Sequence, residues 1–209
     1  VITGEREDEN ITNTEMSVNK VSIATIEKMP ALLGEVDVIR SIQLLPGVST
    51  VGEGATGFNV RGGSIDQNLI LLDEAPVYNS SHLFGFFSVF NPDAIKDIKL
   101  YKGGIPAKYG GRVSSVLDIY QKEGNNKDFK LTGGIGLISS RILAEGPLKK
   151  EKSSFLIGGR SSYAHLFLPL IDNDNKAYFY DLNTKVNFRL NKKNNIFLSA
   201  YFGKDVFGI

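Results

Sequence analysis

The chain has 209 residues, of which 42% are hydrophobic and 22% charged, so it can bury a core and is neither disordered nor fibrous. Its 24 basic and 23 acidic residues give a net charge of +1, which argues against nucleic acid as a partner. Cysteine is absent, so disulfides, zinc ribbons and thiol catalysis are excluded, and the composition suits an oxidising periplasm or outer membrane.

The N-terminal sequence VITGEREDEN lacks the charged head and apolar stretch of a signal peptide, as a mature exported protein would. No window holds about 18 uncharged apolar residues, so a membrane-spanning helix is not predicted, although membrane-spanning β-strands are still allowed. Residues 1–20 are polar and acidic without periodicity, and we expect them to form a flexible N-terminal arm.

Two helices are expected next. Ser22 is placed to cap a short helix that runs through Lys28 and is ended by Pro30. A second helix is predicted over residues 31–45, because apolar residues recur on one face until Pro46-Gly47 ends it.

Short β-like runs follow, and Asn91 before Pro92 predicts one helical turn ahead of the third run. Residues 21–122 are therefore expected to form a small α+β domain with a short mixed sheet. The runs cover residues 58–61, 69–72, 98–101 and 113–119.

The pattern changes after residue 122. From Tyr178 to Leu190, apolar and polar residues alternate strictly over 13 residues, whereas a soluble strand usually has about 5 or 6. An apolar face resumes at residues 196–202, and less regular alternation covers residues 130–144 and 153–163. Four long strands joined by polar turns, with aromatic residues near their ends, are typical of a transmembrane β-barrel wall.

The number of strands limits what this segment can build. The smallest membrane barrels have about 8 strands, and a barrel that holds a plug has about 22. The 87 residues after position 122 (209 minus 122) supply four strands, so they cannot close a barrel. We therefore expect the sequence to be the front part of a longer protein.

Five motifs occur in a fixed order: LLPGV at 44–48, FNVRGG at 58–63, LILLDEAPV at 69–77, IKDIKLYKGGIPAKYGG at 95–111, and SSVLDI at 114–119. In this order and spacing they resemble the plug domain of TonB-dependent outer-membrane receptors. The segment NSSHLFGFFSVFNPDAIK is similar to members from Bacteroidetes. The resemblance covers roughly residues 20–122 and continues into the first barrel strands.

The resemblance implies an α+β plug domain at residues 21–122, followed at residues 123–209 by the antiparallel transmembrane strands of an incomplete barrel. It implies a transporter in the cell outer membrane that contacts lipid, needs no cofactor and is energised by the TonB complex. The imported nutrient would be a small ligand such as a metal chelate, a vitamin or a glycan. The alternative is a non-transporting docking or signalling subunit of a larger assembly, with a lipoprotein partner; a soluble α/β binding protein is a third interpretation.

The resemblance also suggests contact residues. Val1, Ile2 and Thr3 are similar to the end of the segment that TonB recognises, or they belong to an ordinary flexible terminus. Arg61 matches an arginine that, in plugs of this family, faces the barrel wall. An arginine suits this role because a guanidinium can bind a carboxylate of the wall with two parallel hydrogen bonds. Arg112 is the second candidate, and the alternative for both is a solvated arginine beside a turn.

Glycines and one acidic pair mark turns of the expected plug. No Gly-Lys-Ser/Thr and no Gly-x-Gly-x-x-Gly motif accompanies the glycines, so tight turns are preferred to phosphate binding. Asp73-Glu74 stands where the family usually has Asp-Gly, so a left-handed conformation at Glu74 would be costlier than at glycine. Asp73 is expected to close its turn through a side-chain hydrogen bond. The turn glycines are Gly62, Gly63, Gly103, Gly104, Gly110 and Gly111.

Residues 78–90, here called the aromatic loop, are too long for a simple turn, and binding residues concentrate in such loops. The residues predicted to face a ligand are Tyr78, His82, Phe84 and Phe86; the alternative is that the loop packs against the inner barrel wall. A lone histidine among aromatics is more often a packing residue than a ligand. No catalytic triad, metal-binding motif or carboxylate pair stands out, so the sequence predicts neither an enzyme nor a metal site.

Overall fold

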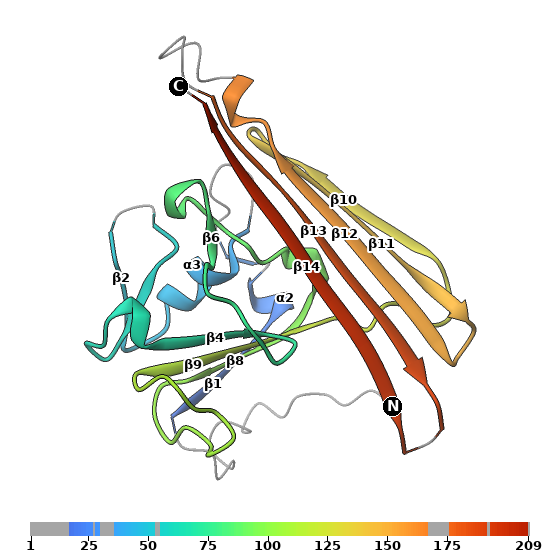
Figure 1. The fold of residues 1–209 in the computed structure, drawn as a ribbon, viewed down its shortest axis with the longest axis horizontal. Coiled ribbons are helices and arrows are strands. Elements are labelled where there is room, and N and C mark those ends of the chain that lie inside the picture. Colours follow the sequence, from blue (N-terminus) through green and yellow to red (C-terminus); the bar gives the residue numbers. More distant parts are fainter. Residues whose placement is uncertain are drawn as a thin grey trace.

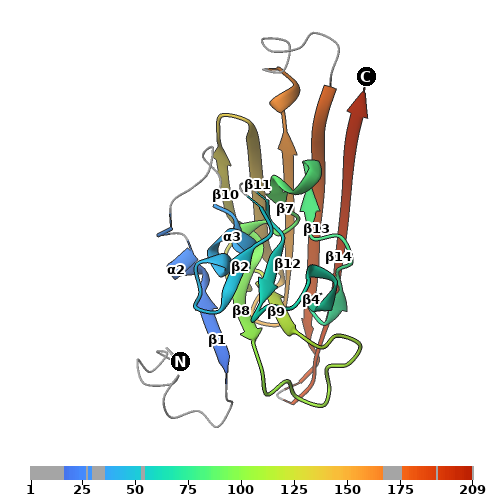
Figure 2. The same cartoon turned by 90° about the vertical axis from the view of Figure 1, so that its left-hand side faces the viewer.

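The computed structural model describes residues 17–26, 28–29, 36–52, 55–166, 176–191 and 193–208. These residues form an N-terminal domain of strands and short helices and a long antiparallel sheet that stands along one side of it (Figure 1). The view turned by 90° shows the N-terminal domain in front of the long sheet (Figure 2). Among the predicted features, Val1, Ile2, Thr3, Pro30 and residues 31–35 lie outside the described residues.

Within the described residues, a five-stranded mixed sheet organises the N-terminal domain. A short mixed sheet was predicted, but residues 18–20 were expected to belong to the flexible arm, whereas they pair with residues 99–101. Neighbouring strands run antiparallel except β4 (Asn68–Leu72) and β9 (Ser115–Gln121), which run parallel. A separate hairpin pairs β2 (Val48–Thr50) with β3 (Phe58–Val60). The order in the mixed sheet is β1 (Val18–Ser22), β8 (Ile95–Tyr101), β9 (Ser115–Gln121), β4 (Asn68–Leu72) and β5 (Ala75–Pro76).

Two short helices cover one face of this sheet. Helix α2 (Ile23–Ile26) follows Ser22, whose hydroxyl accepts a hydrogen bond from the amide of Thr25 at 3.3 Å, so the predicted cap is confirmed. Helix α3 (Val38–Gln43) begins after Asp37, whose Oδ1 accepts from the amides of Ile39 and Arg40 at 2.8 and 3.1 Å. The prediction that this helix starts at residue 31 is therefore wrong, because an aspartate that caps these amides keeps its own backbone extended.

Single turns and short strands complete the domain. The predicted turn before β8 is confirmed as η3 (Pro92–Ala94), where Asn91 accepts from the amide of Asp93 at 3.1 Å. Another such turn, η1 (Ile65–Gln67), precedes β4. Within the aromatic loop, β6 (Ser81–His82) pairs with β7 (Phe87–Ser88) around the turn η2 (Leu83–Gly85).

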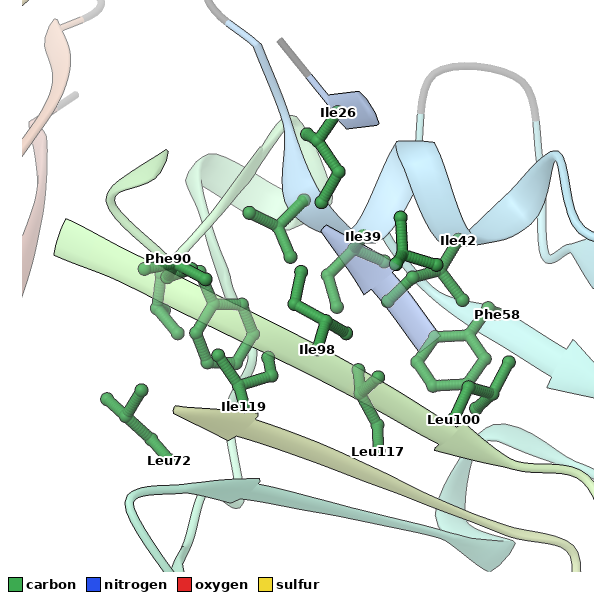
Figure 3. Close-up of a cluster of buried hydrophobic side chains, with 14 of the residues drawn as sticks. Ile26, Ile39, Ile42, Phe58, Leu72, Phe90, Ile98, Leu100, Leu117 and Ile119 are labelled. Carbon is green, nitrogen blue, oxygen red and sulfur yellow. The ribbon is translucent and has the colours of Figure 1, made fainter. Parts of the chain in front are cut away.

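The main hydrophobic core lies between the two helices and the central strands (Figure 3). Strands β8 and β9 point alternate side chains into it, which is the expected use of a period-two pattern in a half-covered sheet. A smaller cluster of Leu71, Tyr101 and Val116 lies on another side of the sheet. The fully buried members of the main core include Ile26, Ile39, Ile42, Phe90, Ile98, Leu100, Leu117 and Ile119.

Five antiparallel strands, each paired with its sequence neighbours, form the long sheet. Four strands were predicted, and that number is wrong because residues 130–144 contain a turn in which the amide of Gly136 donates to the carbonyl of Ser139 at 2.8 Å. Another turn, η4 (Ala164–Leu166), follows the third strand. The strands are β10 (Lys130–Ile135), β11 (Ser139–Lys149), β12 (Ser153–Ser162), β13 (Lys176–Arg189) and β14 (Asn195–Gly208).

The long sheet is polar toward the N-terminal domain and apolar on its other face. In β13, Asp181, Asn183, Lys185 and Asn187 are buried, whereas the alternating Tyr180, Leu182 and Phe188 are exposed. Strands β10 and β14 do not pair with each other in the described residues, so the sheet is open, as an incomplete barrel requires. Within the same residues, no helix is long and apolar enough to cross a membrane.

The core predicts the effect of its truncation. Replacing the fully buried Ile98 by alanine should lower the free energy of unfolding of the N-terminal domain by about 2–5 kcal/mol, because lost contacts add to a residual cavity. Proteolysis at increasing urea concentration measures this change. The exposed Lys96→Ala on the same strand is the control, and identical urea midpoints for both variants would contradict the assignment of this core.

Candidate functional site

The contact between the N-terminal domain and the long sheet contains a buried ion pair. The ammonium of Lys185 on β13 lies 2.8 Å from Oδ1 of Asp73, and both side chains are buried. Lys185 also donates to the carbonyl of Gln121 at 3.1 Å. Asp73 accepts from the backbone and side-chain nitrogens of Gln121 at 3.0 Å each. The additional hydrogen bonds satisfy groups that a buried pair alone would leave unpaired.

This arrangement changes the predicted role of Asp73. Rather than closing its own turn, its carboxylate reaches β9 and β13, because a buried ammonium and two amide donors bind a carboxylate more strongly than a local amide does. The turn itself is left-handed at both Asp73 and Glu74, with φ of 48° and 72°. Glu74 therefore adopts the conformation that was expected to cost more than glycine.

A second buried ion pair lies on the same face of the long sheet, four residues before Lys185 along β13. Arg160 on β12 donates through Nε and Nη2 to Oδ2 of Asp181 on β13, at 2.9 and 2.5 Å. The same Nη2 donates to the carbonyl of Ser88 at 2.6 Å, and the amide of Ser88 donates to Oδ2 of Asp37 at 2.8 Å. The guanidinium is thereby linked through the backbone of one residue, Ser88, to the cap of α3. Burial raises the pKa of the Asp37 carboxyl, and the amides of Ser88 and Arg40 oppose this rise.

His82 is buried where the aromatic loop meets β13 and β14. Its Nδ1 lies 3.1 and 3.2 Å from the two carboxylate oxygens of Asp205, and its Nε2 lies 2.9 Å from the hydroxyl of Tyr201. Nε2 is also 3.4 Å from Oδ2 of Asp181. The imidazole stacks on Phe179 with ring centroids 4.3 Å apart and planes 7° from parallel. Because an ionised carboxylate can only accept a hydrogen bond, Nδ1 of His82 is the donor to Asp205.

Contacts from other strands reinforce the interface. Arg141 on β11 pairs with Asp93 at 2.8 Å. Glu123, which follows β9, accepts from Asn187 on β13 through its side chain at 3.1 Å and from Ser154 on β12 through its carbonyl at 2.6 Å. Polar pairs therefore line the contact along much of its length.

The rest of the aromatic loop is open. Tyr78, Phe84 and Phe86 are 90%, 85% and 55% exposed, whereas His82 is buried. The ring of Phe84 lies 4.4 Å from that of Phe207 near the end of β14. Figure 1 draws this loop at the top of the N-terminal domain, toward the end of the long sheet where β14 stops. His82 packs on the long sheet, as the alternative expected, and it is buried; the contact of Tyr78, Phe84 and Phe86 with a ligand stays a prediction.

Comparison with known proteins identifies this architecture. The family model of the TonB-dependent receptor plug domain matches residues 10–116, which is just over half of the chain. The chain belongs to the TonB-dependent receptor family. Its N-terminal domain is the plug, its long sheet is called the wall from here on, and it is an outer-membrane protein.

Solved receptors share the fold at low sequence identity. The siderophore receptor PirA from Acinetobacter baumannii aligns with a TM-score of 0.66 and 20% identity, over 92% of this chain and 32% of its own. The ferric enterobactin receptor PfeA from Pseudomonas aeruginosa aligns with a TM-score of 0.63 and 18% identity, over 91% of this chain and 33% of its own. This chain thus spans about a third of their length. A search of curated proteins gives no match.

The two predicted contact arginines lie elsewhere on the plug. Arg61 donates to the hydroxyl of Ser17 at 3.1 Å, and Arg112 donates to the carbonyl of Gly111 at 3.1 Å; both side chains are exposed. Within the described residues, neither makes a hydrogen bond or ion pair to β10–β14. Their contact with a barrel wall stays a prediction.

The predicted glycine turns differ in what they require. Gly62 has φ of 82°, a backbone conformation that favours glycine. At Gly63 the constraint is space, because a Cβ there would lie 2.6 Å from Cβ of Ser114. Gly104 and Gly111 also have positive φ, and Gly103 approaches Arg61. Gly110 shows neither constraint.

Sequence reasoning missed most of the wall residues that contact the plug. Arg160, Asp181, Lys185 and Asp205 carry charge on the inward face of strands whose other face is apolar, and that pattern was the available signal. It does not tell which plug residue each charge meets, because partners lie up to 123 positions apart in sequence.

Breaking the Asp73–Lys185 pair should loosen the plug. Lys185→Met leaves a buried carboxylate without its cation, which should cost about 3–5 kcal/mol, and adding Asp73→Asn should recover much of that loss. Urea-dependent proteolysis of the full-length receptor in detergent gives both values. Asp97→Asn, which removes the exposed pair with Lys96, is the control and should change stability by less than about 1 kcal/mol. Additive effects of the two interface substitutions would refute the pair.

Proposed function

We propose that the full-length protein is a TonB-dependent transporter that imports a small nutrient across the outer membrane. In this proposal the arm is limited to the residues ahead of β1, the plug extends from β1 to residue 122, and residues 123–209 are the first strands of the barrel. The observation that carries it is the polar inward face of β13, whose charges pair with the plug while the opposite face is apolar and exposed. A wall of this kind separates lipid from a filled lumen.

The nutrient class is supported by the relatives and by the aromatic loop. The similar structures are described as siderophore receptors, a ferric enterobactin receptor and a copper transporter, so a metal or metal chelate leads the candidates, ahead of a vitamin or a glycan. Phe84 and Phe86 in the aromatic loop and Phe207 on β14 of the wall present exposed rings, and those of Phe84 and Phe207 lie together. Such rings pack against apolar or planar parts of a ligand.

Uptake that depends on TonB is the first test. Cells with this receptor as their only importer should take up ferric enterobactin, cyanocobalamin or a maltooligosaccharide, and loss of TonB should abolish uptake.

Phe84→Ala should weaken binding of the transported probe by about 1 kcal/mol or more, because it removes one ring of an aromatic pair.

The exposed Lys96→Ala on β8, outside the aromatic loop, is the control for Phe84→Ala and should bind the probe like the parent. Uptake that is unchanged without TonB would remove the transport proposal in favour of a docking or signalling subunit. Unchanged affinity of Phe84→Ala would remove the ring pair from the ligand site.

We also propose that the apolar face of the wall contacts outer-membrane lipid. Leu198 on β14 is 71% exposed, and its neighbours on that face are also exposed and apolar: Ile196, Phe202, Leu182 and Phe188. A face of this composition in water would be a large unsatisfied apolar surface.

An arginine on that face should impair assembly. Leu198→Arg should destabilise the folded wall by about 2–4 kcal/mol, because a guanidinium would enter hydrocarbon. Heat-modifiable migration of the full-length receptor from outer-membrane fractions reports the folded fraction. Thr132→Arg on the inward face of β10 is the matched control and should assemble normally. Equal assembly of both variants would exclude lipid contact at Leu198.

A further inference from the structure

The turn at the tip of the aromatic loop has a strained backbone. Leu83, Phe84 and Gly85 have φ of 50°, 58° and 100°, so three successive residues are left-handed. Glycine accepts this region readily, but the Cβ of leucine or phenylalanine crowds its own backbone there. A turn of this kind persists only where surrounding contacts fix it, and such turns concentrate at functional sites.

Wall and plug fix this turn from opposite sides. Oδ1 of Asp205 accepts from the amide of Leu83 at 3.1 Å, and the same carboxylate binds Nδ1 of His82. The side chain of Leu83 is buried with Phe87 and Phe179. On the plug side, the carbonyl of Gly85 accepts from the amide of Thr56 at 2.7 Å. One wall carboxylate therefore holds two consecutive residues at the entrance of the turn.

His82 fits a slot in the wall. Phe179 covers one face of the imidazole, and Tyr201 and Asp205 bind its two nitrogens. Gly203 on β14 makes room for this arrangement, since a Cβ there would lie 3.0 Å from Cε1 of His82 and 2.5 Å from the hydroxyl of Tyr201. Glycine inside a strand marks such a close approach. An imidazole held on both nitrogens and one face has a fixed orientation.

We propose that His82 is a positioning residue: with Asp205 it holds the left-handed turn 83–85 and thereby keeps Phe84 against Phe207 on the ligand-facing surface. The role of that surface rests on the proposed function. We call the bonds of Asp205 to His82 and Leu83 the clamp. If the clamp opens, the backbone of Leu83 and Phe84 relaxes toward right-handed conformations and the ring of Phe84 leaves Phe207. A ligand that packs on both rings stabilises the clamp by the same factor by which the clamp strengthens its binding.

The clamp also connects ligand binding to plug retention. His82 and Leu83 belong to the plug, whereas Asp205, Tyr201 and Phe179 belong to the wall. Arg160, which pairs with Asp181 beside His82, binds the carbonyl of Ser88, which lies in the loop after its tip. The loop is therefore attached to the wall on both sides of its tip.

Hydrogen exchange of the full-length receptor in detergent tests the clamp without any ligand. Asp205→Ala and His82→Leu should raise amide exchange in residues 80–88 by about tenfold or more, while β4 and β9 stay protected. Ser199→Ala, on the same face of β14, is the control and should exchange like the parent. Asp205→Asn gives a milder variant, and heat-modifiable migration identifies any variant that fails to fold. Parent-like exchange in every folded variant would overturn the clamp.

A glycine at position 84 tests whether Asp205 holds a strained backbone or only packs against the loop. Phe84→Gly accepts a left-handed backbone and removes a mostly exposed ring, so in this background Asp205→Ala should raise exchange much less than in the parent. Equal increases in both backgrounds would show that Asp205 supports no strained turn.

The functional consequence is measured with whichever probe the parent transports, ferric enterobactin, cyanocobalamin or a maltooligosaccharide. His82→Leu and Asp205→Ala should weaken its binding by about tenfold, with Ser199→Ala unchanged. Raised exchange with parent-like binding would overturn the positioning role. If the parent transports none of the probes, the proposed function fails, and hydrogen exchange still decides whether the clamp exists.

Discussion

The contact between plug and wall depends on strands that are polar on the face toward the plug and apolar on the opposite face. A β-strand turns successive side chains to opposite faces, so one strand can be apolar on one face and charged on the other without any change of backbone. Strand β13 does this over 14 residues and points Asp181, Lys185 and Asn187 toward the plug. Within the described residues, the plug is attached to the wall by polar pairs and by two small apolar clusters. One contains Leu83, Phe87 and Phe179 beside His82, and the other contains Ala94, Leu143 and Leu156.

Under the proposed transport function, this kind of attachment suits a domain that is displaced from the wall. Buried ion pairs add little net stability over apolar contacts, yet each depends on both partners, so the interface is specific without being a continuous core. The main hydrophobic core lies within the plug, between α2, α3 and the mixed sheet, and Tyr201 is the wall residue that packs against it. The core of the plug is therefore largely separate from its polar contacts with the wall.

Local patterns in the sequence predicted the elements well and the contacts poorly. The strands at 58–61 and 69–72, the cap at Ser22 and the turn at Pro92 follow from apolar runs and capping residues, which act over a few positions. The fifth wall strand was missed because the turn at residues 136–138 lacks polar residues. Long-range partners were not predictable: Asp73 was assigned to its own turn, since nothing local indicates an ammonium 112 positions away. Likewise, packing of the aromatic loop on the wall was one of two alternatives drawn from the sequence, but the individual partners of His82, Asp205 and Tyr201, were not predicted.

The strained turns show why the plug needs the wall for its detailed shape. Asp73-Glu74 and Leu83-Phe84 are both left-handed without glycine at those positions, and in both a carboxylate joins plug to wall: Asp73 binds Lys185, and Asp205 binds Leu83. A turn that is costly in isolation is retained when buried partners fix it. The departure from Asp-Gly at residues 73 and 74 is thus tolerated because the bond to Lys185 holds the turn. The same reasoning implies that a plug withdrawn from its wall would relax first at these two turns, before its hydrophobic core opens.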